Sequence, residues 1–142
     1  MSLSPDRGLS PRELSRAQIG AETAIIINLS NGKNLAQVGM KAKGIPARPI
    51  QPVWWYLSSE PDPCTVTVDL LMKTHGSGAF ASIFTGALAG LEPKITGPAT
   101  ENDGSAAGWP ILTITEWVEA RLAALTAGAP TQVSLTIHGV YV

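Results

Sequence analysis

The sequence predicts an α+β domain: an antiparallel sheet of about five strands with two amphipathic helices on one face. Three observations lead to this prediction. Five stretches are typical of strands, two stretches repeat apolar residues at helical spacing, and turn-rich segments separate them. The length of 142 residues fits one domain. We expect an N-terminal arm over residues 1–22 and a single α+β domain over residues 23–142.

The arm contains a predicted short helix in "LSPRELSRAQIG". Ser10 and Glu13 form a capping box, and Leu9 and Leu14 stand where a hydrophobic staple closes a helix start. A helix this short is marginally stable alone. We therefore expect the arm to dock on the domain or on a neighbouring subunit.

A hairpin is predicted where "TAIIINLS" and "NLAQVGMKA" flank Asn31 and Gly32. Asn-Gly is the preferred chemistry of a two-residue hairpin turn. This register would place Ile27 opposite Ala36. Further strands are expected at 52–58, at "CTVTVDLLM" and at "TQVSLTIHGVYV", where apolar and polar residues alternate.

The two helices are predicted later in the chain. Apolar residues recur at helical spacing over roughly 78–91. A second capping box, Thr113 with Glu116, begins a helix that ends before Gly128. Between the two helices, residues 93–108 are expected to form a long, turn-rich loop.

Two adjacent tryptophans, Trp54 and Trp55, follow a proline-rich approach, "GIPARPIQP". Successive side chains on a strand point to opposite faces, so one tryptophan faces outward. Prolines cannot donate ladder hydrogen bonds, which favours an edge strand. We expect the outward tryptophan to be covered by an arm or a helix, because tryptophan is a typical interface anchor.

Charge is sparse and unevenly distributed. Only 15% of residues are charged, whereas 44% are hydrophobic. Residues 1–50 hold seven lysines and arginines against three acids (+4), and residues 51–142 hold three against eight (−5). This asymmetry favours head-to-tail contacts between copies. Glu101 and Asp103 in the predicted loop would then meet arginines of an arm, or line a lumen through which DNA passes.

Catalytic patterns are weak. Gly76 and Gly78 between a strand and a predicted helix fit a loose phosphate-binding pattern, but Ser77 as a helix N-cap explains the same residues. The two histidines, His75 and His138, have no metal-ligand partners at suitable spacing. We therefore predict no cofactor, no metal and no enzymatic activity. A small-ligand or nucleotide-binding enzyme that uses the Gly76–Gly78 loop is the alternative of another class.

Cys64 is a single cysteine, so an internal disulfide is impossible. No signal-peptide pattern is present, and no apolar run approaches the length needed to span a bilayer. We expect synthesis in a host cytoplasm and no membrane partner.

The stretch "GIPARPI", residues 44–50, resembles the "PARPF" signature of small tailed-phage proteins of the virion morphogenesis and tail-completion type. The predicted architecture is also similar to that of tail terminator and neck proteins, which form rings. These resemblances imply a structural subunit in the virion, forming a homo-oligomeric ring at the tail or head–tail junction and contacting other virion proteins. A capsid decoration protein is the structural alternative. The residues expected at interfaces are Leu9, Arg12, Leu14, Arg16, Arg48, Trp54, Trp55, Glu101 and Asp103.

Overall fold

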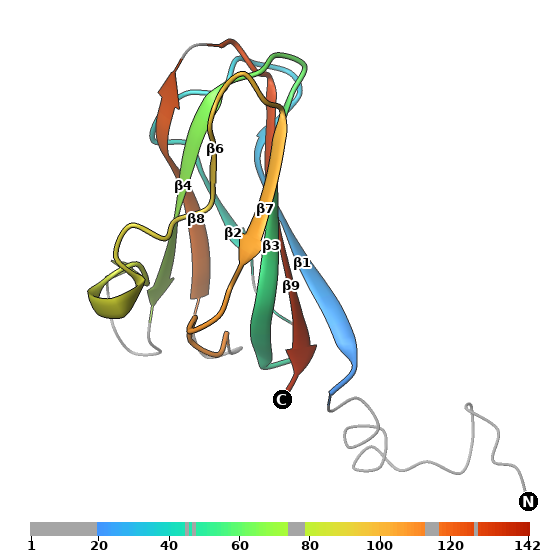
Figure 1. Cartoon of the computed structure of the whole chain (residues 1–142), viewed down its shortest axis with the longest axis vertical. Helices are drawn as coiled ribbons and strands as arrows, with labels where there is room; N and C mark the ends of the chain where they lie inside the picture. The colour runs from blue at the N-terminus through green and yellow to red at the C-terminus, as the bar shows by residue number, and fades with distance from the viewer. Residues whose placement is uncertain (1–19, 45, 47, 74–78, 113–116, 127) are drawn as a thin grey trace, which may run out of the picture.

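The chain folds into two antiparallel sheets packed face to face (Figure 1). The computed structural model describes residues 20–44, 46, 48–73, 79–112, 117–126 and 128–142. The first sheet has the order β1 (Glu22–Asn31), β9 (Gln132–Tyr141), β3 (Ile50–Glu60) and β7 (Glu101–Ser105). The second has the order β2 (Lys41–Gly44), β8 (Trp117–Thr126), β4 (Thr65–Lys73) and β5 (Ala81–Ser82), and β6 (Lys94–Ile95) also pairs with β4.

The predicted α+β class is wrong, because the described part of the chain contains strands and one short 3-10 helix, η1 (Gly86–Leu88), but no α-helix. The helix predicted over 78–91 is replaced, within its described residues, by β5, η1 and irregular backbone. Gly86 and Gly90 have φ values of 58° and 80°, which are far from the helical value. The apolar residues of this segment are therefore spaced like a helix but do not form one.

The second predicted helix is strand β8. Its neighbours β2 and β4 supply hydrogen-bond partners on both sides, so its backbone is satisfied by the sheet. Val118, Ala120 and Leu122 alternate into the core. The capping-box residues Thr113 and Glu116 lie outside the described residues.

The predicted loop over 93–108 contains two strands. β6 pairs with β4, and β7 pairs with β3 along its whole length. The N-terminal hairpin is also wrong: β1 pairs with β9, and Ile27 lies opposite Leu135 rather than Ala36. Residues 41–44, which follow the turn, pair with β8 in the other sheet.

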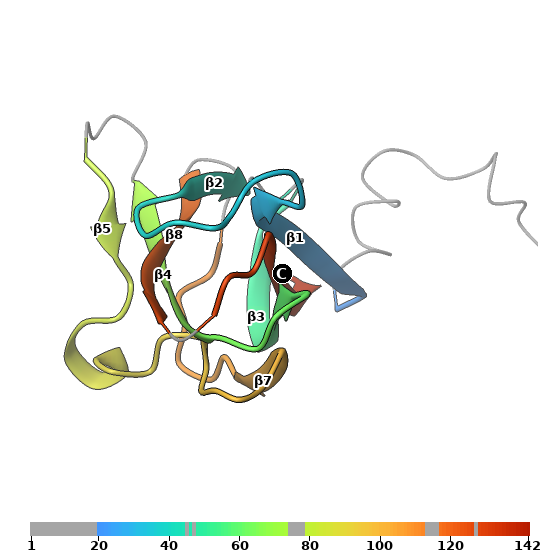
Figure 2. The same ribbon diagram turned by 90° about the horizontal axis from the view of Figure 1, so that it is seen from above.

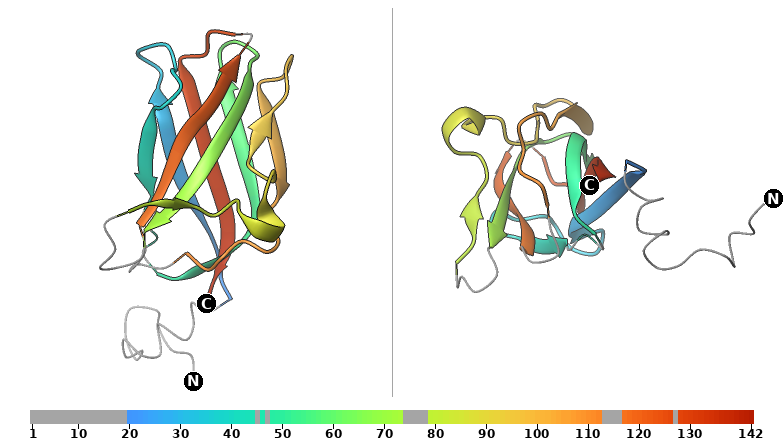
Figure 3. Two further views of the ribbon diagram at one scale, coloured as in Figure 1. Left: turned by 90° about the vertical axis from the view of Figure 1, so that its left-hand side faces the viewer. Right: turned by 90° about the horizontal axis from the view of Figure 1, so that it is seen from below.

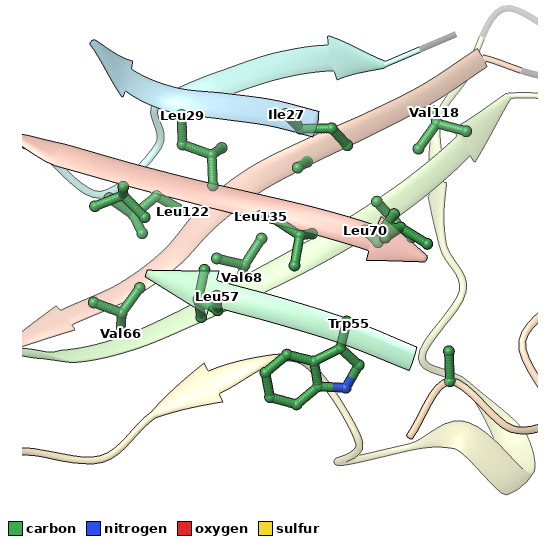
Figure 4. Close-up of a cluster of buried hydrophobic side chains, with 14 of the residues drawn as sticks. Ile27, Leu29, Trp55, Leu57, Val66, Val68, Leu70, Val118, Leu122 and Leu135 are labelled. Carbon is green, nitrogen blue, oxygen red and sulfur yellow. The ribbon is translucent and has the colours of Figure 1, made fainter. Parts of the chain in front are cut away.

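The strands predicted at 52–58, 64–72 and 131–142 are confirmed as β3, β4 and β9. Their inward residues meet between the sheets, with Leu57 and Leu135 facing Val68 and Leu70 (Figure 4). All four side chains are buried. Burying such side chains is the main favourable term in forming the sandwich.

β3 is not the predicted edge strand, because it lies between β9 and β7. Its register with β9 shifts between Pro52 and Trp54, so Pro52 sits at an irregularity where the regular hydrogen bonding is interrupted.

One end of the outer side of the second sheet is covered by the chain itself, where Leu71 and Glu119 are buried. Seen from above and from the side, the segment after residue 79, in yellow-green, runs outside β4 and β8 (Figures 2 and 3). Ile83 donates a backbone hydrogen bond to Leu70, and the Ser82 hydroxyl donates to Asp69 over 2.6 Å. We call this outer side the covered face.

Candidate interaction surface

The adjacent tryptophans take opposite sides of β3, as the alternation predicts. Trp55 is only 6% exposed and belongs to the core, whereas Trp54 is 39% exposed on the outer side. A Cβ built on Gly104 would lie 2.5 Å from Cζ2 of Trp55, so the missing side chain at Gly104 makes room for the indole. We expected Trp55 at an interface between copies, but its side chain is buried in the core of its own domain.

Trp54 stacks on His138, its neighbour on β9. The ring centroids are 3.6 Å apart and the ring planes differ by 5°. Cross-strand neighbours on one face of a sheet are close enough for such ring contacts. His138 was not among the predicted interface residues, because its partner is distant in the sequence and only strand pairing brings the two rings together.

A groove of about 220 Å³ lies beside this ring pair. It occurs where the register of β3 and β9 shifts between Pro52 and Trp54. At this point β9 approaches β3 so closely that a Cβ on Gly139 would lie 2.5 Å from the carbonyl oxygen of Gln51. The groove is lined by Glu22, Thr23, Val53, Trp54, His138, Gly139 and Val140.

The ring pair belongs to a larger outer surface formed by all four strands of the first sheet. Pairing places Ala24 beside His138, and the next row holds Ile26, Thr136, Tyr56 and Asp103 in strand order. The outward residues of β1, β9, β3 and β7 do not lie under another part of the described chain, and Ile26 is 66% exposed. We call this surface the aromatic face, comprising Ala24, Ile26, Asn28, Val53, Trp54, Tyr56, Ser58, Glu101, Asp103, Ser105, Ser134, Thr136 and His138.

Acidic side chains border the aromatic face on β7. Asp103 lies opposite Tyr56, and Glu101 lies opposite Ser58. The Tyr56 hydroxyl donates a hydrogen bond to the Glu101 carboxylate over 2.5 Å. This bond, with burial and the nearby negative charges, raises the pKa of Tyr56 above its ordinary value. The face thus has an aromatic centre and a negatively charged border.

The structure brings together three of the residues expected at interfaces, Trp54, Glu101 and Asp103, on this one surface. Arg48 lies elsewhere, with its guanidinium carbon 5.2 Å from the centroid of the Tyr141 ring. The remaining candidates, Leu9, Arg12, Leu14 and Arg16, lie outside the described residues.

The candidates for ligand or phosphate chemistry lie outside the described residues, and the single cysteine, which was not a catalytic candidate, is buried in the fold. These candidates are the Gly76–Gly78 loop and His75. Cys64 is buried, and its thiol lies 3.0 Å from the carbonyl oxygen of Thr126. Burial raises the pKa of Cys64, which keeps the thiol protonated and poorly nucleophilic near neutral pH.

Metal-binding clusters and membrane-spanning helices are both absent from the described residues. They contain no group of three or more histidine, cysteine or acidic side chains placed to hold a metal ion. They also include no helix with the length and apolar character needed to cross a membrane.

Compared with known proteins, the chain matches no family model, no curated protein and no solved structure.

Proposed function

We propose that this protein is a non-enzymatic structural subunit that assembles with further copies of itself into a ring at the tail or head–tail junction of a phage-like particle. The observation that carries the self-assembly proposal is the aromatic face. It combines exposed apolar side chains at Ile26 and Val53 with the Trp54–His138 ring pair. Contiguous exposed apolar surface on a small domain is typical of a protein interaction site.

The charge distribution supports another copy of the chain as the partner. The residues of the aromatic face include the carboxylates of Glu101 and Asp103 but no lysine or arginine. Basic residues are instead concentrated in the first 50 residues, which carry a net +4 (seven against three). An acidic face of one copy that meets the basic portion of the next is a heterologous contact, and such contacts generate rings when the rotation closes.

The phage context rests on the resemblance of residues 44–50 to the signature of small virion proteins. In this fold, that stretch runs from the end of β2 to the start of β3 and so joins the two sheets. Arg48 of the stretch packs on Tyr141 of β9. Arg48 therefore contacts its own domain, and we assign assembly to the aromatic face.

The proposal is tested by native mass measurement of the full chain. We expect one closed oligomer of fixed copy number, and we expect Ile26→Lys to convert it to monomer because a charge would then be buried at the contact. Leu35→Lys is the matched control, since Leu35 is another exposed apolar residue but lies in the connection between β1 and β2.

A chain that remains monomeric at high concentration would contradict the ring. Equal loss of assembly in both variants would contradict the role of the aromatic face. A small oligomer that binds intact capsids would favour the decoration alternative.

A further inference from the structure

The groove beside Trp54 and His138 lies next to the point where the N-terminal segment joins the sheet. Glu22 and Thr23 form part of its lining. Just before them, the Gly20 amide donates a hydrogen bond to the carbonyl oxygen of Tyr141 over 2.7 Å, and the Tyr141 amide donates to Ala21 over 3.0 Å. Residues 1–19 are thus attached to the domain at the rim of the groove.

The composition of residues 1–19 complements the aromatic face. The segment carries the apolar residues Leu3, Leu9, Leu14 and Ile19 and the arginines Arg7, Arg12 and Arg16. The aromatic face offers an aromatic groove at its centre and the carboxylates of Glu101 and Asp103 at its border. A leucine suits the groove, and the arginines suit the carboxylates through charge-assisted hydrogen bonds.

The length of the segment is sufficient to cross the face. Four strands spaced about 4.8 Å apart span about 15 Å, whereas 19 extended residues reach up to about 60 Å. The proposed self-assembly, together with the pairing at the start of β1, favours a neighbouring copy as the acceptor. Gly20 and Ala21, the first described residues, still pair with Tyr141 and so continue the line of β1. Leu14 is six residues before Gly20, and six residues span at most about 20 Å, which is enough to reach a neighbouring copy that packs against this end of the sheet.

We propose that residues 1–19 of one copy bind across the aromatic face of the next copy, with a leucine in the groove beside Trp54 and His138 and arginines against Glu101 and Asp103. This inference rests on the proposed self-assembly, for which it names the contacting segment. It also covers the part of Trp54 that remains exposed beside its ring contact with His138.

Photo-crosslinking of the full chain tests which copy supplies the segment. Leu14 is replaced by p-benzoylphenylalanine, and isotopically heavy and light copies are mixed, co-assembled and irradiated. We expect heavy–light adducts between position 14 and peptides that contain Val53 and Trp54 or His138 to Val140. Adducts confined to one isotope, or adducts on the covered face, would overturn the inference.

A charge-swap series tests the border contacts independently. We expect Arg12→Glu with Arg16→Glu to weaken assembly by about tenfold or more, and Glu101→Lys with Asp103→Lys to do the same. Combining all four substitutions should restore assembly, because opposite charges again face each other. Absence of rescue would contradict these contacts.

The native mass of the unmodified chain separates the two proposals. An oligomer without crosslinks to the aromatic face would contradict the binding of residues 1–19 to that face but would be consistent with self-assembly. A chain that stays monomeric would contradict both proposals.

Discussion

The two outer faces of the sandwich differ in what covers them. On the covered face, Leu71 is 5% exposed and Glu119 is 2% exposed, because the segment after residue 79 packs across β4 and β8. On the aromatic face, Ile26 and Trp54 remain exposed. The chain thus covers part of one face with its own residues and leaves the other exposed.

The two faces also differ in how their polar groups are satisfied. On the covered face, the Arg121 guanidinium lies 2.9 Å from the Glu119 carboxylate. The Lys43 ammonium lies 5.6 Å from the centroid of the Phe80 ring. On the aromatic face, Tyr56 bonds Glu101, but the described residues of its rows supply no basic group to balance the carboxylates. The charges described on the covered face are thus paired within the chain, whereas the unbalanced acidic border of the aromatic face favours a basic partner.

The largest effect is expected from damage to the support behind the aromatic face. Gly104→Ala should destabilise the domain by about 1–3 kcal/mol, because the new Cβ would overlap the buried indole of Trp55 and force it to shift. Denaturant unfolding measures this change. Ser58→Ala is the control, since its side chain lies on the outer side, and we expect a change within about 0.5 kcal/mol. Equal unfolding midpoints for the two variants would contradict the tight packing at Gly104.

A smaller effect is expected on the covered face. Arg121→Ala should lower the free energy of unfolding by about 1 kcal/mol, because it removes a charged partner from a buried carboxylate, while the exposure of the arginine limits the loss. Lys41→Ala, at the neighbouring position on β2, is the control. If the two alanine variants unfold at the same denaturant concentration, the Arg121–Glu119 ion pair contributes nothing measurable to the stability of the domain.

The smallest effect concerns the acidic border. Glu101→Gln should lower the pKa of Tyr56 toward the ordinary tyrosine value of about 10, because it removes the negative charge that accepts the hydroxyl hydrogen bond. Ultraviolet absorbance measures the titration of tyrosine to tyrosinate. The Tyr56→Phe variant retains only the Tyr141 signal and so shows which part of the titration belongs to Tyr56. An unchanged titration would show that Tyr56 and Glu101 are not paired in solution.

The sequence predicts the strands whose alternation is unambiguous. In β4 and β9, residues such as Val68, Leu70 and Leu135 alternate with polar neighbours, and the structure buries them as expected. The pattern of residues 117–126 is ambiguous, because glutamate, arginine, alanine and leucine favour helices. Pairing on both sides makes that segment a central strand, and local propensity does not determine such tertiary pairing.

The candidate surface could be predicted only in part. Trp54 was identified from the paired tryptophans, and Glu101 and Asp103 from their place among small polar residues. The sequence "ENDGS" gives no strand signal, because it contains no apolar residue, so the pairing of β7 with β3 was missed. The position of His138 depends on the same long-range pairing. Individual residues were therefore found, but not the surface that they share.

Side-chain footprinting with hydroxyl radicals tests the central claim that the aromatic face is the assembly surface. The full chain is labelled when assembled and again when diluted below its dissociation constant. The account predicts that Trp54, Tyr56 and Ile26 react several-fold less in the assembled protein, whereas Leu35, in the connection between β1 and β2, reacts equally in both states. Equal labelling of Trp54 in both states, or protection confined to the covered face, would contradict the account.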